Sequence, residues 1–428
     1  MRDRPMTRRG LLGAAAAVVG GGLLSGCGSQ ASEDELSYWH PMSGGDGVVM
    51  AGLVDQANGR NLGFHATQTV LAWGPPYYTK LAMASAGGRA PDLAVMHASR
   101  IAGYAPGGLL EPWDLNLLKE VGLTEKDFPP LVWQKGFSED QLYAVALDTH
   151  PFVMFYNPEI LAKAGATDLP GITEAGAFVE ACHKIQRVTG KHAMSYGFLG
   201  DGSQMWRLFY TFYRQSGAEM RLVPGQQAQV DEQAAVNALT YLRSLLDDKI
   251  ASRSGDGGTA TSEFLHGESG ILFGGVWELP TILAEKIPFD ARPIPPLFGK
   301  PAAYADSHTF VLPRQAKHDP ERRRHVYRFV AELLKTSVTW AGAGHIPAYA
   351  PVVESAEYKA LKPQASYAEV TDYVNYDPDV WFSGAGSDFH KYFAENVQNV
   401  LVGAQDPARG FEGFVKRLNV LLDRPQPV

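Results

Sequence analysis

One segment in the middle of the chain is the most informative about the fold. Residues 142–165 read LYAVALDTHPFVMFYNPEILAKAG. The apolar runs on either side of residues 148–151 have the length and composition of buried strands. Asn157 followed by Pro158 is typical of a helix start, because the asparagine side chain caps free backbone N–H groups and proline fits the first helical position. Gly165 is typical of a helix end. The segment therefore predicts two strands followed by a helix.

The same alternation continues on both sides of this segment. Strand-like stretches lie at residues 36–40, 64–70 and 91–96, and helix-like stretches lie at 47–58, 76–86, 173–189, 231–248, 320–334 and 389–402. Alternating strands and helices are typical of βαβ units with a mostly parallel sheet. A chain of 428 residues is also long enough for two domains, each with its own core. We therefore expect an α/β protein with two domains.

The first 27 residues are typical of an export signal. Arg8 and Arg9 precede an apolar run rich in alanine and glycine, which ends in LSGC at residues 24–27. This run is too short to be a good bilayer-spanning segment. The paired arginines resemble a twin-arginine signal, and LSGC resembles a bacterial lipobox, in which Cys27 carries lipid. Residues 28–34 then form a polar tether. The alternative is an uncleaved anchor, and in both cases the rest of the protein lies outside the cytoplasmic membrane.

Cysteine usage fits this interpretation. Cys182 is the only other cysteine, so a lipidated Cys27 leaves no disulfide. Cys182 also lies on an apolar helical stripe, which predicts a buried structural thiol rather than a reactive one.

Several classes of function find no support in the sequence. The net charge of −8 is spread along the chain, whereas nucleic acid and anionic membranes attract clustered basic residues. No HExxH, CxxC, GxSxG or phosphate-loop motif is present, and the 12 histidines are scattered without zinc-site spacing. We therefore expect no enzyme activity, no cofactor and no metal site. A glycosidase pair of carboxylates remains an open alternative, because such a pair has no fixed spacing.

Aromatic residues suggest what the protein binds. Eight tryptophans occur, at positions 39, 73, 113, 133, 206, 277, 340 and 381, several of them beside glycine, proline or a polar residue. A sugar ring offers apolar C–H faces that stack on aromatic planes and hydroxyl groups that need polar partners. For each single tryptophan, packing in the core is the competing interpretation.

Four motifs give the chain a family resemblance. Gly136-Phe137 with residues 142–165 resembles a family pattern in which G-x-x-Y-x-x-P leads into Y-N-x-x-x-F-x-x-A-G, although Ala146 or Leu147 replaces the usual proline and Leu161 the usual phenylalanine. Further matches lie at residues 90–112, 264–277 and 344–348. Together they resemble the extracellular solute-binding proteins of carbohydrate ABC importers, the group that includes maltose-binding protein.

The resemblance implies a two-lobed periplasmic-binding-protein-like fold, with two doubly wound sheets and a ligand cleft between them. The chain would cross between the lobes near Asp148, Asp306 and Gly344. The first lobe would comprise residues 35–147 and 307–344, and the second lobe 149–305 and 345–428. The lobes would close on the ligand by a hinge motion.

The resemblance also implies a set of cleft residues. The expected ligand contacts are His40, Met42, Ser43 and Gly44 after the first strand, Met96, His97 and Ser99 after the third strand, and Asp148, Trp206, Trp277 and Trp381. The competing interpretation of Asp148 is a hydrogen bond that bridges the lobes.

The implied function is that of a monomeric, lipid-anchored receptor, which captures a mono- or oligosaccharide and delivers it to an ABC permease. An amino sugar is a further possibility, because Asp148 could pair with an ammonium group. A glycerophosphodiester or polyamine receptor on the same fold is the main alternative, since Arg100 and Arg207 lie near expected cleft segments and an arginine would suit a phosphodiester. An exported hydrolase and a surface scaffold are the alternatives from other classes.

Overall fold

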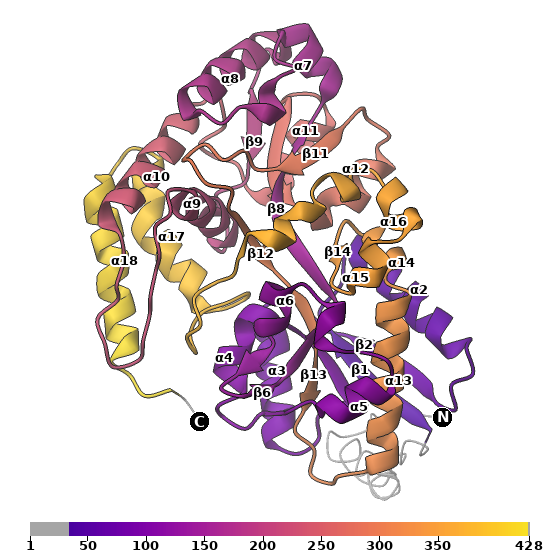
Figure 1. Cartoon of the computed structure of the whole chain (residues 1–428). Helices are drawn as coiled ribbons and strands as arrows, with labels where there is room; N and C mark the ends of the chain where they lie inside the picture. The colour runs from indigo at the N-terminus through magenta and orange to yellow at the C-terminus, as the bar shows by residue number, and fades with distance from the viewer. Residues whose placement is uncertain (1–33, 427–428) are drawn as a thin grey trace, which may run out of the picture.

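The computed structural model describes residues 34–426. The expected signal peptide, the lipidated Cys27 and nearly all of the tether lie outside these residues. Two lobes are stacked in Figure 1, each with a sheet at its centre and helices around it. This arrangement confirms the two-lobed α/β fold.

The first lobe is built on a six-stranded sheet. The strands are β2 (His65–Val70), β1 (Glu35–His40), β3 (Leu93–His97), β13 (His308–Pro313) and β4 (Leu110–Glu111) in spatial order, with β7 (Ala144–Ala146) also paired to β13. The longer helices of this lobe are α2 (Gly45–Asn58), α3 (Pro75–Ala86) and α13 (Pro320–Lys335). Buried residues of these strands and helices form two cores on the first sheet.

The second lobe is built on a seven-stranded sheet. Its strands are β15 (Val374–Asn375), β12 (Ala303–Asp306), β8 (Asp148–Tyr156), β10 (Ile271–Gly275) and β9 (Met194–Tyr196), with β11 (Asp290–Pro293) and β14 (Ile346–Pro347) also paired to β8. Its longer helices are α8 (Ala175–Thr189), α9 (Ser203–Gln215), α10 (Glu232–Leu245), α11 (Gly257–Leu265), α17 (Asp388–Leu401) and α18 (Pro407–Leu422).

Shorter elements complete the two lobes. The short helices are α4 (Ile101–Tyr104), α5 (Leu115–Glu120), α6 (Pro130–Gln134), α7 (Pro158–Ala164), α12 (Leu279–Ala284), α14 (Val338–Ala341), α15 (Ala350–Val353) and α16 (Ala356–Ala360). A small hairpin joins β5 (Phe137–Ser138) to β6 (Gln141–Leu142).

The strand directions correct one expectation. The sheets are mixed rather than mostly parallel, because β8 runs antiparallel to β10, β11, β12 and β14, and β13 runs antiparallel to β3, β4 and β7. The reason is that β8 and β13 continue directly from the other lobe and enter the middle of each sheet. The parallel pairs expected of βαβ units remain between β1 and its neighbours β2 and β3.

The helix signals at Asn157, Pro158 and Gly165 are confirmed, whereas residues 148–151 form the start of β8 rather than a break between two strands. The Asn157 side chain accepts hydrogen bonds from the backbone N–H groups of Glu159, at 3.0 Å, and Ile160, at 3.2 Å. Pro158 occupies the first turn of α7, and Gly165 ends the helix in the left-handed conformation with φ 61°. Cys182 is free and fully buried in α8, as predicted.

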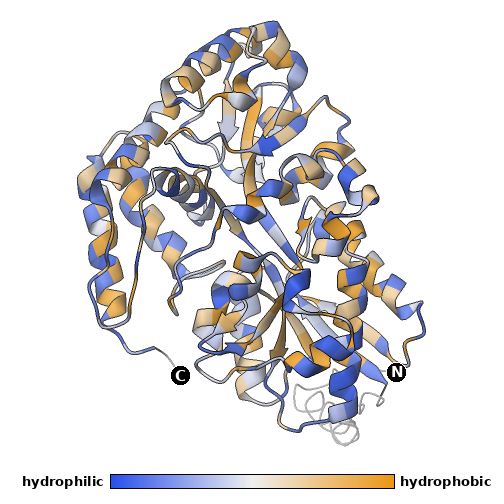
Figure 2. Ribbon diagram, in the orientation of Figure 1, coloured by the Kyte–Doolittle hydropathy of each residue, from blue (hydrophilic) through white to orange (hydrophobic). Residues whose placement is uncertain are grey.

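Three segments run between the lobes. The first is the junction of β7 with β8, the second is Ser307 between β12 and β13, and the third runs through Gly344 and His345 into β14. The start of β8 is hydrophilic in Figure 2, whereas its end inside the second lobe is hydrophobic. Polar side chains are thus concentrated where the crossing segments meet.

Candidate functional site: a cleft between the lobes

A cleft of about 630 Å³ lies between the two lobes. The first lobe contributes the loop after β1, the end of β3 and the start of β13, and the second lobe contributes the starts of α9, α11 and α12. The side chains that line the cleft include Met42, Ser43, Asp46, Trp73, His97 and His308 from the first lobe, Gln204, Arg207, Asp256, Trp277 and Glu278 from the second, and His150 and His345 from the crossing segments.

The loop after β1 reaches the cleft as predicted from the sequence. Met42, Ser43 and Gly44 all line it, and α2 begins directly afterwards. A side chain at Gly47 would place its Cβ 2.5 Å from the Met42 carbonyl oxygen, so glycine is required for the loop to turn this tightly. The backbone N–H of Gly47 donates to Asp46 at 2.8 Å. Short, glycine-rich backbone is therefore exposed to the cleft.

Trp277 presents its indole ring to the cleft from the second lobe. The residue follows β10, and a Cβ on Gly275 would lie 2.1 Å from two atoms of the indole ring. Only glycine at 275 allows the ring to lie this close to the backbone. The Arg207 guanidinium lies over the same ring at 4.8 Å from its centroid, and the His150 ring approaches it edge-on at 6.0 Å. The orientation of Trp277 is therefore fixed before any ligand arrives.

The remaining predicted contacts lie in three places. His97, at the end of β3, lines the cleft. His40 and Met96 are buried in the first sheet, where the His40 ring pairs with Gln68 at 2.9 Å. Ser99 is buried against Asp306, its backbone N–H donating to that carboxylate at 3.2 Å. His40, Met96 and Ser99 therefore support the cleft wall from behind.

Trp206 and Trp381 are corrected in position. Trp206 is fully buried in the core of the second lobe, where its indole N–H donates to Asp377 at 2.6 Å. Helix α9 is covered on nearly all sides: Gln204 and Arg207 lie on the face that lines the cleft, whereas Trp206 lies on a face that packs into the core. Trp381 lines a different hollow, beside Tyr78 and Arg100.

Asp148 is also buried behind the cleft rather than exposed in it. Its carboxylate accepts hydrogen bonds from the Trp340 indole N–H at 2.6 Å and from the His308 backbone N–H at 2.9 Å. The carboxylate also pairs with the Nδ1 atoms of His150, at 2.9 Å, and His308, at 2.7 Å. Asp148 thus joins the first two crossing segments, which matches the lobe-bridging interpretation; a direct contact with ligand stays a prediction.

Electrostatics around Asp148 follow from this burial. Burial alone would raise the pKa of Asp148, but His308, His345 and His150 hold it well below its usual range. Burial lowers the pKa of His308, yet Asp148 outweighs this and raises it above the ordinary value. Burial lowers the pKa of His150 to about 4 and that of His345 to about 3. Burial therefore favours neutral imidazoles at His150 and His345, whereas Asp148 favours the protonated form of His308.

Comparison with known proteins identifies the family. Residues 67–368, more than half of the chain, match the family model described as bacterial extracellular solute-binding protein. The chain belongs to this family. Its members are extracellular by description, and the present solute-binding protein accordingly acts outside the cytoplasm. Among the described residues, no helix is both long and apolar enough to cross a membrane.

Solved structures share the fold at low sequence identity. UgpB from Mycobacterium tuberculosis, in complex with glycerophosphocholine, matches with a TM-score of 0.77 and 20% identity over 91% of this chain and 98% of that chain. The GacH receptor of Streptomyces glaucescens, studied with acarbose, gives 0.76 and 17% over 91% and 98%. Lmo0181 from Listeria monocytogenes, an ABC substrate-binding protein in complex with cycloalternan, gives 0.75 and 17% over 91% and 99%.

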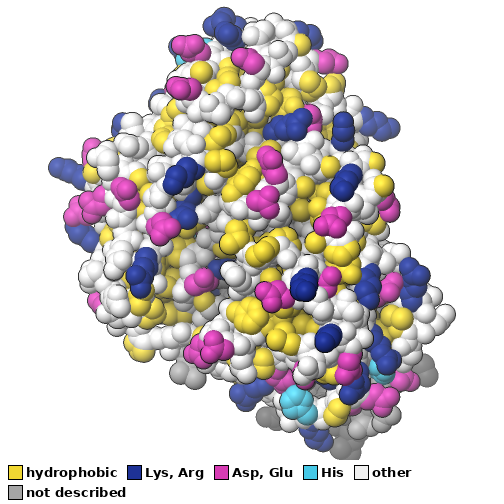
Figure 3. All heavy atoms as spheres, viewed as in Figure 1, with side chains coloured by type: hydrophobic (Ala, Val, Ile, Leu, Met, Phe, Trp, Pro, Cys, Tyr) yellow, Lys and Arg dark blue, Asp and Glu magenta, His cyan; other side chains and the backbone are white. Residues whose placement is uncertain are grey.

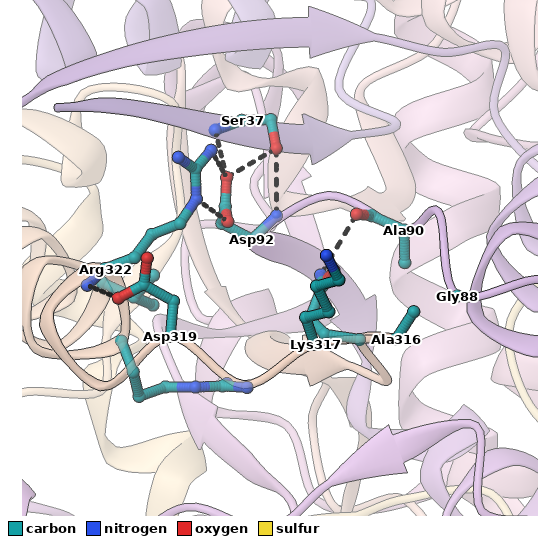
Figure 4. Close-up of a pocket in the computed structure, with 11 residues that line it drawn as sticks. Ser37, Gly88, Ala90, Asp92, Ala316, Lys317, Asp319 and Arg322 are labelled. Atoms are coloured by element: carbon teal, nitrogen blue, oxygen red, sulfur yellow. Dashed lines mark hydrogen bonds and ion pairs between the residues drawn. The ribbon is translucent and has the colours of Figure 1, made fainter. Parts of the chain in front are cut away.

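A second hollow, of about 380 Å³, is lined by first-lobe residues that include Ser37, Asp92 and Arg322 (Figure 4). Its polar groups bond to one another. Asp92 accepts hydrogen bonds from the Ser37 hydroxyl at 2.7 Å and from the Arg322 guanidinium at 2.8 Å, and Gln315 donates to the Ala90 carbonyl at 3.1 Å. We assign this hollow a structural role and consider the interlobe cleft the ligand site.

The histidines that line the cleft near the hinge were not predicted from the sequence. His150, His308 and His345 are far apart in the chain, and no spacing motif connects them. They come together only because the three crossing segments converge. Trp73, Asp256 and Glu278 were missed for a similar reason, since each lies in a loop or at a helix end whose direction depends on the other lobe. Arg207 does line the cleft, as its position in the sequence suggested, whereas Arg100 does not.

Proposed function

We propose that this solute-binding protein is the carbohydrate receptor of an ABC importer. The observation that carries the proposal is the cleft itself, in which Trp277 and Trp73 offer aromatic planes and Gln204, Asp256 and Glu278 offer polar partners. Its volume of about 630 Å³ falls in the range of roughly 300–1,000 Å³ that is typical of small-molecule sites. Aromatic planes beside a few polar groups match the faces and hydroxyls of a sugar.

The proposed mechanism is capture by lobe closure. A sugar ring stacks on Trp277, while Met42, Ser43, Gly44 and His97 contact it from the first lobe. The lobes then close around the ligand, and the closed form docks on the permease, which selects it over the open form. An affinity in the micromolar range, about −8 kcal/mol, suits a receptor that must also release its ligand.

The chain organisation proposed from the sequence fits this role. Residues 1–27 would direct export, Cys27 would carry the lipid, and residues 28–34 would tether a monomeric receptor to the outer face of the cytoplasmic membrane. The lobe boundaries, 35–147 with 307–344 and 149–305 with 345–428, are supported by the distribution of strands between the two sheets. Acidic and basic side chains are interspersed on the face in Figure 3, which supports a small-molecule ligand rather than nucleic acid.

Titration calorimetry against mono- and oligosaccharides tests the proposal. We expect at least one carbohydrate to bind with one site per chain and to raise the melting temperature, since a ligand that binds only the folded state stabilises it. Absence of heat with every carbohydrate, together with binding of another solute, would refute it. Hydrolysis of a chromogenic glycoside would instead favour the enzyme alternative.

A glycerophosphodiester is the second candidate ligand, and Arg207 is the observation that favours it. The guanidinium lines the cleft, and its Nε has no hydrogen-bond partner. Arginine recognises phosphate oxygens well, and the UgpB structure contains glycerophosphocholine. Glycerophosphocholine therefore belongs in the same titration panel. Tight binding of this ligand, lost on Arg207→Met, would decide for the second candidate.

A further inference from the structure

Four buried side chains converge where the three crossing segments meet. Asp148 and His150 lie on β8, His308 begins β13, and His345 precedes β14. Each side chain can offer one ligand atom such that all four atoms lie within 4.8 Å of one another. At Zn–ligand distances of about 2.0–2.1 Å, tetrahedral ligand atoms lie about 3.4 Å apart, so only a modest contraction is needed.

The arrangement of the imidazole rings agrees with a shared ion. Ring centroids are separated by 4.3 Å for His150 and His308, 5.2 Å for His308 and His345, and 5.7 Å for His150 and His345. Three imidazoles on one tetrahedral ion would have centroids about 5 Å apart at the usual Zn–N distance. The observed separations bracket this value.

His345 supplies an independent indication of a missing partner. The side chain is 1% exposed, and neither of its ring nitrogens has a hydrogen-bond partner. Its Nδ1 lies 3.5 Å from the Asp148 Oδ2, close to the spacing of two ligands on one metal. The Trp340 ring stacks on it at 4.5 Å with an interplanar angle of 4°, which fixes its orientation. A buried imidazole held this firmly, with two unpartnered nitrogens, is unfavourable unless something binds it.

We propose that Asp148, His150, His308 and His345 form a binding site for a divalent ion of the zinc class, which links the three crossing segments. Three imidazoles and a carboxylate are ligands that zinc accepts in tetrahedral geometry. The ion enters from the cleft, because the three histidines line it. A ligand histidine that is protonated releases its extra proton to solvent when the ion binds, and each neutral imidazole keeps one proton, on the ring nitrogen that faces away from the ion. The Trp340 indole N–H then holds the Asp148 carboxylate in place as an outer partner.

Charged residues near the site include one that disfavours cation binding and one that favours it. Arg207 lines the same cleft and disfavours a cation, whereas Asp46, on the opposite lobe, favours one. Asp148 provides a full negative charge inside the site. This site is independent of the ligand proposed for the cleft, because it uses groups at the hinge rather than the stacking surface of Trp277.

The test uses the full-length chain without a polyhistidine tag. After equilibrium dialysis against Zn²⁺, mass spectrometry of the metal content should give one zinc per chain, and zinc should raise the melting temperature. Co²⁺ should produce the intense visible absorption of a tetrahedral site. His345→Gln should weaken zinc binding by at least roughly 100-fold, since a direct ligand matters at least as much as an outer partner.

A matched control is available in His325, which is also buried and has an unpartnered Nδ1 but lies outside the cleft. His325→Gln should leave zinc binding unchanged. Circular dichroism checks that each variant folds. The Co²⁺ spectrum of the unaltered chain tests the site even if a variant does not fold. Failure of the unaltered chain to retain zinc, or equal retention by His345→Gln, would overturn the proposal and leave the cluster as a hydrogen-bonded network only.

Discussion

Replacing Trp277 by alanine tests the stacking surface of the cleft. A buried tryptophan contributes roughly 200 Å² of contact, so one face of the indole offers about 100 Å² to a sugar ring. At about 25 cal/mol per Å², losing this face costs about 2.5 kcal/mol of binding free energy. This corresponds to roughly a 70-fold higher Kd. Trp277→Phe should recover part of the loss, because the smaller ring still offers an apolar plane.

The assay is titration calorimetry with the tightest carbohydrate from the panel. Trp381→Ala is the matched control, because Trp381 is also partly buried but lines a different hollow. We expect Trp381→Ala to leave the affinity unchanged. Trp277 also lies beside Phe152, with 6.5 Å between the ring centroids, so the alanine variant could lose stability. Circular dichroism of each variant checks that it remains folded. An unchanged affinity for Trp277→Ala, or an equal loss for Trp381→Ala, would refute the reasoning.

Three further predictions follow from single contacts. Gly275→Ala should displace the Trp277 ring, because its Cβ would lie 2.1 Å from the indole, and should raise the Kd roughly tenfold in calorimetry; an unaltered Kd would contradict this. Trp206→Phe removes the indole donor to buried Asp377 and should lower the free energy of unfolding by about 2 kcal/mol in urea titrations without changing ligand affinity. A weaker affinity in the folded variant would show instead that Trp206 contacts the ligand. Asp92→Asn should cost about 2 kcal/mol at neutral pH. Burial alone would raise the pKa of Asp92, but Arg322 and Ser37 hold it below the ordinary value of 3.8. This stabilisation is therefore present above pH 3.8 and is lost as the pH falls through the lower folded-state pKa. Urea titrations at several pH values should show the free energies of unfolding of the wild-type and Asp92→Asn proteins converging in acid, and a constant difference would contradict the assignment.

Local signals in the sequence were sufficient for most of the secondary structure. Asn157, Pro158 and Gly165 define both ends of α7 through capping and backbone conformation, which depend only on neighbouring residues. The loop from Met42 to Gly44 could be placed at the cleft because a strand followed by glycines and a helix start leads to the ligand edge of such a sheet.

Positions that depend on tertiary convergence could not be predicted. Asp148 is buried because Trp340 and His308, from distant segments, surround it. Trp206 is buried because α9 is covered on nearly all sides, which its sequence does not reveal. Strand direction was missed as well, since β8 and β13 enter their sheets from the other lobe.

A crystal structure of the protein with the tightest ligand from the calorimetric panel tests the central claim most directly. The account predicts a carbohydrate between the lobes, with one sugar ring stacked on Trp277 and with contacts to the loop from Met42 to Gly44. A ligand bound in another hollow of the molecule, or a cleft occupied by a phosphodiester held by Arg207 instead of a sugar, would contradict it.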